Sequence, residues 1–137
     1  MTDLETAVNS LGTHSVALCK NGKVITSDKR GVAPLTELIE SGADISGFSA
    51  ADRVVGKAAA MLMIHLGIID VFAVTLSESA EALLKKHGVS VKFKNRTERI
   101  MNRDNTGPCP MEQTVFGTDN IEEGVNAIMK KTGKYKK

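Results

Sequence analysis

The sequence predicts an α/β fold built on a mixed β-sheet, and three observations carry this prediction. Residues 14–27 form two β-rich runs on either side of Asn21-Gly22, a pattern typical of an antiparallel hairpin with a two-residue turn. Residues 71–93 read as strand, helix and strand, a βαβ unit whose two strands should be parallel. Residues 58–64 are apolar on every side of a helix, so they need cover from a sheet and from neighbouring helices.

Composition and charge suit one globular domain, which we place at residues 1–132. The chain has 137 residues, of which 42% are hydrophobic and 25% charged. Its net charge is +2, but five lysines lie in the last eight residues, and without them the domain is slightly acidic. We therefore expect residues 133–137 to be a basic, disordered tail, and we do not expect nucleic acid as a partner.

The sequence also bears on the location of the protein. No apolar run approaches the roughly 20 residues that a membrane span needs, and the first residues, MTDLETAV, lack the basic start of a signal peptide. The two cysteines, Cys19 and Cys109, lie far apart in the chain and suggest no disulfide framework. We expect a cytoplasmic protein that does not bind membranes. We also expect a small molecule as its ligand, and the sequence leaves open whether the protein forms a homo-oligomer.

Helix signals divide the remainder of the chain. Thr2 and Glu5 have the spacing of a capping box, and Pro34 suits the first residue of a short helix. The predicted helices besides the central one cover residues 3–11, 34–41, the stretch from Ser77 or Ser79 to His87, and 119–131.

The central predicted helix, residues 49–67, is the main pointer to a functional site. Because its body is buried, its first turns must carry Asp52, Arg53, Gly56 and Lys57 to a surface or a cleft. Glycine costs about 1 kcal/mol relative to alanine inside a helix, so Gly56 indicates that a ligand or a packed loop approaches the backbone. We expect Arg53 or Lys57 to meet anionic groups of a ligand and Asp52 to accept hydrogen bonds. The alternative is that Asp52 caps the helix and Lys57 is a surface lysine.

Residues 96–117 give the weakest secondary-structure signal in the chain. Their turn-rich stretch holds Cys109 between two prolines, which makes the backbone stiff. Polar groups in the same segment, those of Asn102, Arg103 and Glu112, make it a candidate lid over the start of the central helix. A metal-independent enzyme would use Cys109 as its nucleophile and Asp52 or Glu112 as its acid-base group, so these three are the candidate catalytic residues. The simpler interpretation of Cys109 is a small thiol in a rigid loop.

Three stretches of the chain resemble a small prokaryotic family of unknown function within the cytidine deaminase-like superfamily. They are GVAPL at 31–35, DRVVGKAAA at 52–60 and NRDNTGPCPME at 102–112. The resemblance implies a three-layer α/β/α sandwich around the mixed sheet. It also implies a nucleotide-like ligand, by analogy of fold alone.

The zinc-binding motifs of the deaminases are vacant in this sequence. A zinc deaminase has a His or Cys followed two residues later by Glu, where this chain has Ala51-Asp52-Arg53. It adds a Pro-Cys-x-x-Cys pair at the next helix, where this chain has Leu76-Ser77-Glu78-Ser79. Without those thiolates nothing holds a metal that would generate hydroxide near neutral pH. We therefore expect no bound zinc and no other cofactor.

Two classes of function remain. The first is a small-ligand-binding protein or metal-independent enzyme, with its site at the start of the central helix and residues 102–112 as the lid. The alternative is a non-catalytic interaction or regulatory domain that retains a deaminase-like fold.

Overall fold

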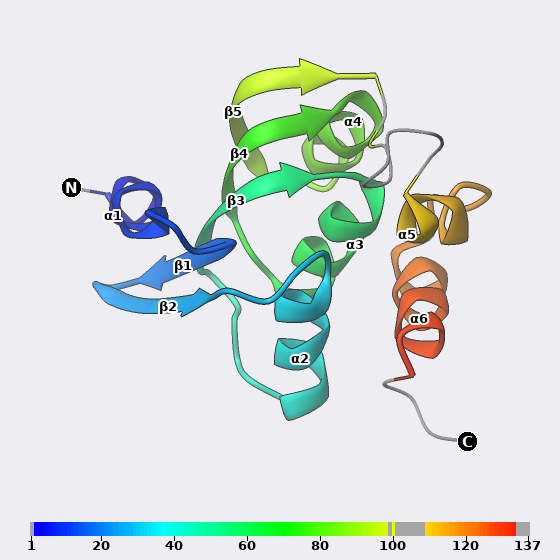
Figure 1. The fold of residues 1–137 in the computed structure, drawn as a ribbon, viewed down its shortest axis with the longest axis horizontal. Helices are drawn as coiled ribbons and strands as arrows, with labels where there is room; N and C mark the ends of the chain where they lie inside the picture. The colour runs from blue at the N-terminus through cyan, green and yellow to red at the C-terminus, as the bar shows by residue number, and fades with distance from the viewer. Residues whose placement is uncertain (1, 99, 101–108, 134–137) are drawn as a thin grey trace.

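The computed structural model describes residues 2–98, 100 and 109–133 as an α/β structure with a mixed five-stranded sheet (Figure 1). The strands of the sheet are β1 (Val16–Lys20), β2 (Lys23–Ser27), β3 (Ser49–Val55), β4 (Asp70–Ser77) and β5 (Ser90–Thr97). The helices in the described residues are α1 (Asp3–Leu11), α2 (Ala33–Ser41), α3 (Lys57–Leu66), α4 (Glu78–Lys86), α5 (Pro110–Thr114) and α6 (Ile121–Lys131).

The strands lie in the order β2-β1-β3-β4-β5. Strand β1 is antiparallel to both of its neighbours, whereas β3, β4 and β5 are parallel to one another. The carboxyl ends of these three strands therefore meet at one edge of the sheet, and Figure 1 shows their arrowheads pointing to the side where α5 lies.

The hairpin is as predicted. Leu18 is opposite Ile25 and Cys19 is opposite Val24 in the observed register. Asn21 and Gly22 both have positive φ angles, of 51° and 81°, which a type I′ turn requires. The parallel pairing of β4 with β5 confirms the predicted βαβ unit.

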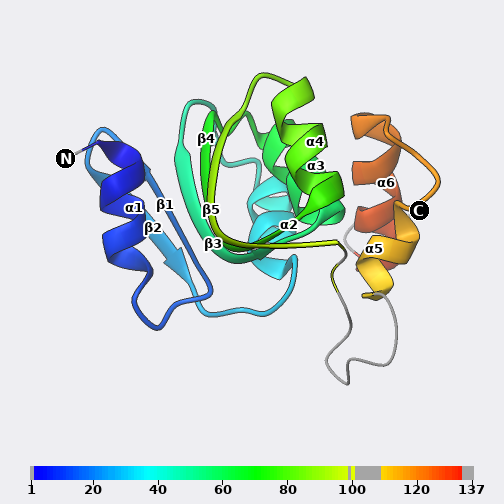
Figure 2. The same cartoon turned by 90° about the horizontal axis from the view of Figure 1, so that it is seen from above.

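Helices cover both faces of the sheet (Figure 2). Helix α1 packs on one face, where Ala7 and Leu11 join a small apolar cluster with Ala17, Cys19 and Ala51 of the strands. Helices α2, α3 and α4 lie on the opposite face, and α6 packs against the outer side of α3. As a result, α3 is enclosed between the sheet and α6.

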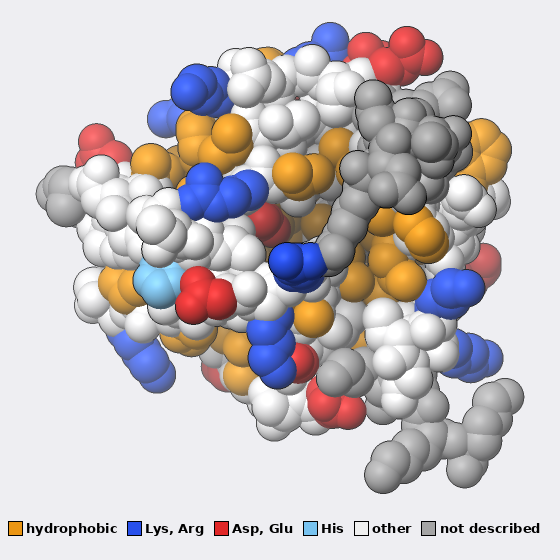
Figure 3. All heavy atoms as spheres, viewed as in Figure 1, with side chains coloured by type: hydrophobic (Ala, Val, Ile, Leu, Met, Phe, Trp, Pro, Cys, Tyr) orange, Lys and Arg blue, Asp and Glu red, His pale blue; other side chains and the backbone are white. Residues whose placement is uncertain are grey.

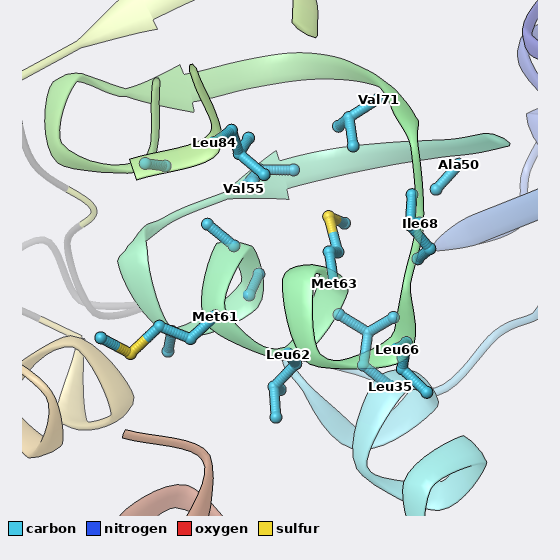
Figure 4. Packing of buried hydrophobic residues seen from close by; sticks show 14 of the residues in the cluster. Leu35, Ala50, Val55, Met61, Leu62, Met63, Leu66, Ile68, Val71 and Leu84 are labelled. Carbon is cyan, nitrogen blue, oxygen red and sulfur yellow. The ribbon is translucent and has the colours of Figure 1, made fainter. Parts of the chain in front are cut away.

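The enclosure of α3 explains why its residues 58–64 are apolar on all sides. Figure 4 shows Met63 directed toward the strands and Met61 directed away from the sheet, toward α5 and α6. Both side chains are fully buried. Gly124 of α6 allows the close approach, because a Cβ atom there would collide with the sulfur of Met61.

The prediction that the central helix begins at Ser49 is wrong. Residues 49–55 form β3, and the helix begins only at Lys57, after Gly56. Residues 49–55 mix helix-favouring alanines with strand-favouring valines, so tertiary packing decides between the two. Ala50 and Ala51 have no exposed surface because helices pack on both faces of this central strand.

The other helix signals hold, with small shifts in the ends. The capping box of Thr2 and Glu5 is present, and the hydroxyl of Ser77, rather than that of Ser79, caps α4. Helix α6 begins at Ile121, with Asn120 as its cap, instead of at residue 119. Helix α5 is not predicted from the sequence. The last four residues of the predicted tail lie outside the described residues.

Among the described residues, none of the helices has the length and hydrophobicity that crossing a membrane would require.

Truncation of the inner face of α3 tests this packing. We expect Met63→Ala to lower the free energy of unfolding by about 2–5 kcal/mol, as is usual when a buried methionine is removed. Ile69→Ala is the matched control, because Ile69 is 58% exposed and its loss should cost no more than about 0.5 kcal/mol. Urea denaturation of both variants gives the comparison. Equal losses would contradict the burial of α3.

Candidate functional site

A pocket with a volume of about 560 Å³ lies at the carboxyl edge of the parallel strands. Its described lining consists of Lys57, Ser79, Glu98, Ile100, Glu112, Gln113 and Phe116. The first four follow the ends of β3, β4 and β5, and the last three come from α5 and the turn after it. Ligands of open α/β sheets bind outside this same edge. Figure 3 shows hydrophobic side chains gathered between α3 and α5 on one face of the molecule.

The Glu112 carboxylate joins α5 to the start of α3. The backbone N–H of Lys57 donates to Oε1 of Glu112 at 2.7 Å, and the N–H of Ala58 donates to Oε2 at 2.8 Å. These two amides belong to the first turn of α3, which has no partner for them within the helix. A carboxylate is the favoured acceptor there, because the helix dipole places positive partial charge at this end.

Gly56 makes room for the Glu112 carboxylate. Gly56 has extended backbone angles, with φ of −100° and ψ of −175°, so any residue could adopt its conformation. A Cβ atom at this position, however, would lie only 2.5 Å from Oε1 of Glu112. The close approach expected at Gly56 is therefore made by a side chain of the same protein.

Lys57 is engaged in a second link to the same region. Its ammonium group lies 2.8 Å from Oδ1 of Asp119, in the connection between α5 and α6. The Lys57 side chain is only 13% exposed, whereas that of Asp119 is 70% exposed. The hydrogen bond from Lys57 and its positive charge lower the pKa of Asp119. Lys57 therefore reaches the pocket with its charge already matched by a carboxylate.

Phe116 supplies an apolar surface to the pocket. Its side chain is 84% exposed, the highest value among the exposed large hydrophobic residues of the described chain. Phe116 follows Val115, which is fully buried and anchors this turn to the core. An exposed aromatic ring on an anchored turn beside a pocket is available to contact a bound molecule.

Arg53 does not lie at the start of a helix, and it does not line the pocket. It is on β3, where its Nε donates to the carbonyl oxygen of His14 at 2.9 Å and its Nη2 donates to that of Gly12. Gly12 is the C-terminal cap of α1. Arg53 thus stabilises the end of α1, where a positive charge is favoured.

Asp52 is also on β3, between Val16 of β1 and Ala73 of β4. Burial raises the pKa of Asp52 to about 7; hydrogen bonds from the backbone of Arg53 and Val54 and the charge of Arg53 oppose the shift. Asp52 is therefore a carboxyl group that holds its proton close to neutrality. It is absent from the described lining of the pocket.

The structure brings one of the three residues proposed for catalysis to the pocket. Glu112 belongs to the described lining, and Asp52 and Cys109 do not. Cys109 is the N-terminal cap residue of α5, and its backbone N–H donates to the carbonyl oxygen of Ile100 at 3.1 Å. Asn102 and Arg103, proposed as ligand-binding residues, lie outside the described residues.

The described chain contains no group of three or more His, Cys, Asp and Glu residues placed to hold a metal ion. Its two cysteines are both free, with Cys19 buried and Cys109 partly buried. The expectation that no zinc or other cofactor binds stays a prediction.

Sequence reasoning missed Ser79, Glu98, Ile100, Gln113 and Phe116. The sequence does contain a signal for Ser79 and Glu98 as site residues, because residues that follow parallel strands meet at one edge of the sheet. A helical prediction for residues 49–55 hides this signal, since it removes β3, the strand that leads to Lys57 at the same edge. No local pattern marks Gln113 or Phe116, whose positions depend on how α5 docks.

The link between Gly56 and Glu112 predicts coupled mutations. Gly56→Ala should lower the free energy of unfolding by about 1–3 kcal/mol, because it displaces a carboxylate that accepts two hydrogen bonds. In a Glu112→Ala background the same substitution should cost about 1 kcal/mol or less, since the collision is gone. A double-mutant cycle by urea denaturation measures the difference. Additive effects would rule the contact out.

Asp52 predicts a dependence of stability on pH. The unfolded chain loses the Asp52 proton near its ordinary pKa of 3.8, whereas the folded protein keeps it until about pH 7. The contribution to the free energy of unfolding therefore falls as the pH rises through this interval. Asp52→Asn should stabilise the protein at about pH 8, by at most about 4 kcal/mol, and should do little at about pH 4.

Thermal denaturation at the two pH values measures this effect of Asp52→Asn. The control is Asp44→Asn, which alters an exposed aspartate and keeps the oxygen that accepts from the N–H of Ser46. A gain that is the same at both pH values would contradict the raised pKa of Asp52.

Comparison with known proteins gives a family but no activity. A structure of a DUF1893 family protein from Thermotoga maritima is 22% identical, with a TM-score of 0.85 over 96% of this chain and 91% of that one. A diaminohydroxyphosphoribosylaminopyrimidine deaminase/5-amino-6-(5-phosphoribosylamino)uracil reductase from Thermotoga maritima is 13% identical, with a TM-score of 0.45 over 66% of this chain and 34% of that one. The second likeness is too weak to establish a shared fold.

No curated protein matches the chain. The family model described as a domain of unknown function, DUF1893, matches residues 7–132, which is nearly the whole of this chain. The chain therefore belongs to the DUF1893 family.

Proposed function

We propose that this protein binds a small molecule in the pocket between the start of α3 and α5. The observation that carries the proposal is the pocket itself, at the carboxyl edge of β3, β4 and β5. Its volume of about 560 Å³ is within the range of roughly 300–1,000 Å³ that is usual for ligand sites.

The chemistry of the lining supports binding. Phe116 and Ile100 contribute apolar surface to the lining, and Ser79 and Gln113 contribute polar groups. Such a mixture is typical of ligand pockets, in which apolar groups supply contact area and a few polar groups fix orientation. The lining residues come from three strand ends and from α5, so the fold has to be complete for the pocket to form.

The sequence resemblance suggests which ligands to test first. A cytidine deaminase-like three-layer sandwich would bring nucleosides and nucleotides to the head of the list, by analogy of fold. Catalysis is not part of the proposal. Of the three residues considered for it, only Glu112 lines the described pocket, and both of its carboxylate oxygens accept hydrogen bonds from α3.

The test is a thermal-shift screen of the full chain against nucleosides, nucleotides and related small metabolites. A ligand at about 100 times its dissociation constant should stabilise the native state by about 2.7 kcal/mol and raise the melting temperature. Phe116→Ala should weaken a hit that occupies the pocket by about tenfold, because it removes an aromatic contact.

Phe93→Ala is the matched control, because Phe93 is also an exposed phenylalanine, at 40%, but does not belong to the described lining. It should leave the affinity for the hit within about twofold of that of the unmodified protein. A hit that binds both variants equally well does not occupy this pocket. A screen without any hit would favour the interaction or regulatory domain instead.

A further inference from the structure

The two edge strands of the sheet differ in charge. Strands β2 and β5 are the outermost strands, and Figure 1 shows β2 on the outer side of β1. Strand β5 carries three basic residues, Lys92, Lys94 and Arg96. Charged side chains, lysine above all, protect an edge strand from pairing with another chain. Strand β2 carries a single charge, at Lys23, and its residues 24–27 are β-branched or small. It therefore lacks the protection that β5 has.

The hairpin determines which backbone groups of β2 point outward. Lys20 and Lys23 flank the two-residue turn and are opposite each other, which makes them a hydrogen-bonded pair. Because such pairs alternate along an antiparallel ladder, the N–H and C=O groups of Val24 and Thr26 point away from β1. Within the described part of the chain, these groups make no hydrogen bond to another segment. Each of the two residues thus presents one donor and one acceptor at the outer edge.

The same edge leaves apolar side chains uncovered. Val24 is 39% exposed, and Ile25 is only partly buried against the main core. Val24 is opposite Cys19, which belongs to the small cluster under α1, and Ile25 is opposite Leu18, which belongs to the main core. The two side chains therefore lie on opposite faces of the sheet. A strand added at this edge would cover apolar area on both faces.

We propose that β2 pairs with β2 of a second copy of this chain, antiparallel and centred on Ile25. This register places the two copies of Ile25 opposite each other and Val24 of each copy opposite Thr26 of the other. The outward N–H and C=O groups of both copies then bond one another, and the two sheets become one continuous sheet.

The single charge of β2 favours an identical strand as its partner. In this register Lys23 lies opposite Ser27 of the second copy, and the two copies of Lys23 are four positions apart along the ladder, or about 14 Å. This separation exceeds the Debye length of about 8 Å at physiological ionic strength, so their repulsion is screened. The inference is independent of the proposed function, because no residue of β2 belongs to the described lining of the pocket.

Cysteine trapping tests the register. Ile25→Cys in a Cys109→Ser background should form an intermolecular disulfide with oxidised glutathione, because Cα atoms of a non-hydrogen-bonded pair lie about 4.5 Å apart. Cys19 is fully buried on the other face of the hairpin and does not compete. Lys23→Cys is the matched control, since its copies lie beyond the roughly 7 Å that a disulfide can span. Ile25→Cys should dimerise at least about tenfold faster than Lys23→Cys.

Sedimentation equilibrium of the full chain tests the pairing without cysteines. A strand pair is a small interface, so we expect a weak dimer that forms at concentrations up to about 1 mM. Thr26→Lys adds a charge to an exposed position of the edge and should raise the dissociation constant of the dimer at least about tenfold. Asn95→Lys is the matched control, because it makes the same change of charge at an exposed position of β5, the other edge. It should leave the constant within about twofold.

Three results would overturn the inference: a chain that stays monomeric over the whole concentration range, a dimer that Asn95→Lys weakens as much as Thr26→Lys does, or equal rates of trapping for Ile25→Cys and Lys23→Cys. None of them bears on the pocket, whose ligand the thermal-shift screen tests separately.

Discussion

The burial of residues 58–63 of α3 is the constraint on which the rest of the structure depends. A helical segment that is apolar around its whole circumference needs cover on its outer side as well as from the sheet. One side is covered by the sheet, to which Met63 points, and the outer side is covered by α6, toward which Met61 points. The close contact at Gly124 allows this outer cover to approach. The elements next to α6 in the chain, α5 and the turn after it, lie at the carboxyl edge of the parallel strands.

The passage of the chain along that edge creates the pocket. Helix α5 has no fully buried residue, and its hydrophobic contact with the core is made by the partly buried Met111. The helix is also held by the Glu112 carboxylate on the amides of α3 and by the buried Val115 that follows it. Phe116 directly follows Val115 and stays exposed beside the pocket that α5 lines.

The same contact determines the electrostatics of the site. The start of α3 would be an anion site if its amides were free, but the protein supplies its own anion. Lys57 is likewise matched by Asp119. Glu112 and Lys57 thus stabilise the fold and also line the pocket. Arg53 and Asp52, which the sequence suggested for the site, belong instead to the body of the sheet; Arg53 there stabilises the end of α1.

The sequence by itself determined the α/β class, the hairpin, the βαβ unit, and the burial of the helix body at residues 58–64. These features depend on local signals, such as the Asn21-Gly22 turn and the apolar periodicity, which act over a few residues. Only the tertiary structure decided that residues 49–55 form a strand and that Glu112 reaches α3. Both depend on partners distant in the chain: β1 and β4 pair with β3 from either side, and Glu112 lies more than fifty residues from the amides that it binds. The local propensity of residues 49–55 is mixed, and pairing inside a sheet covered on both faces decided for a strand.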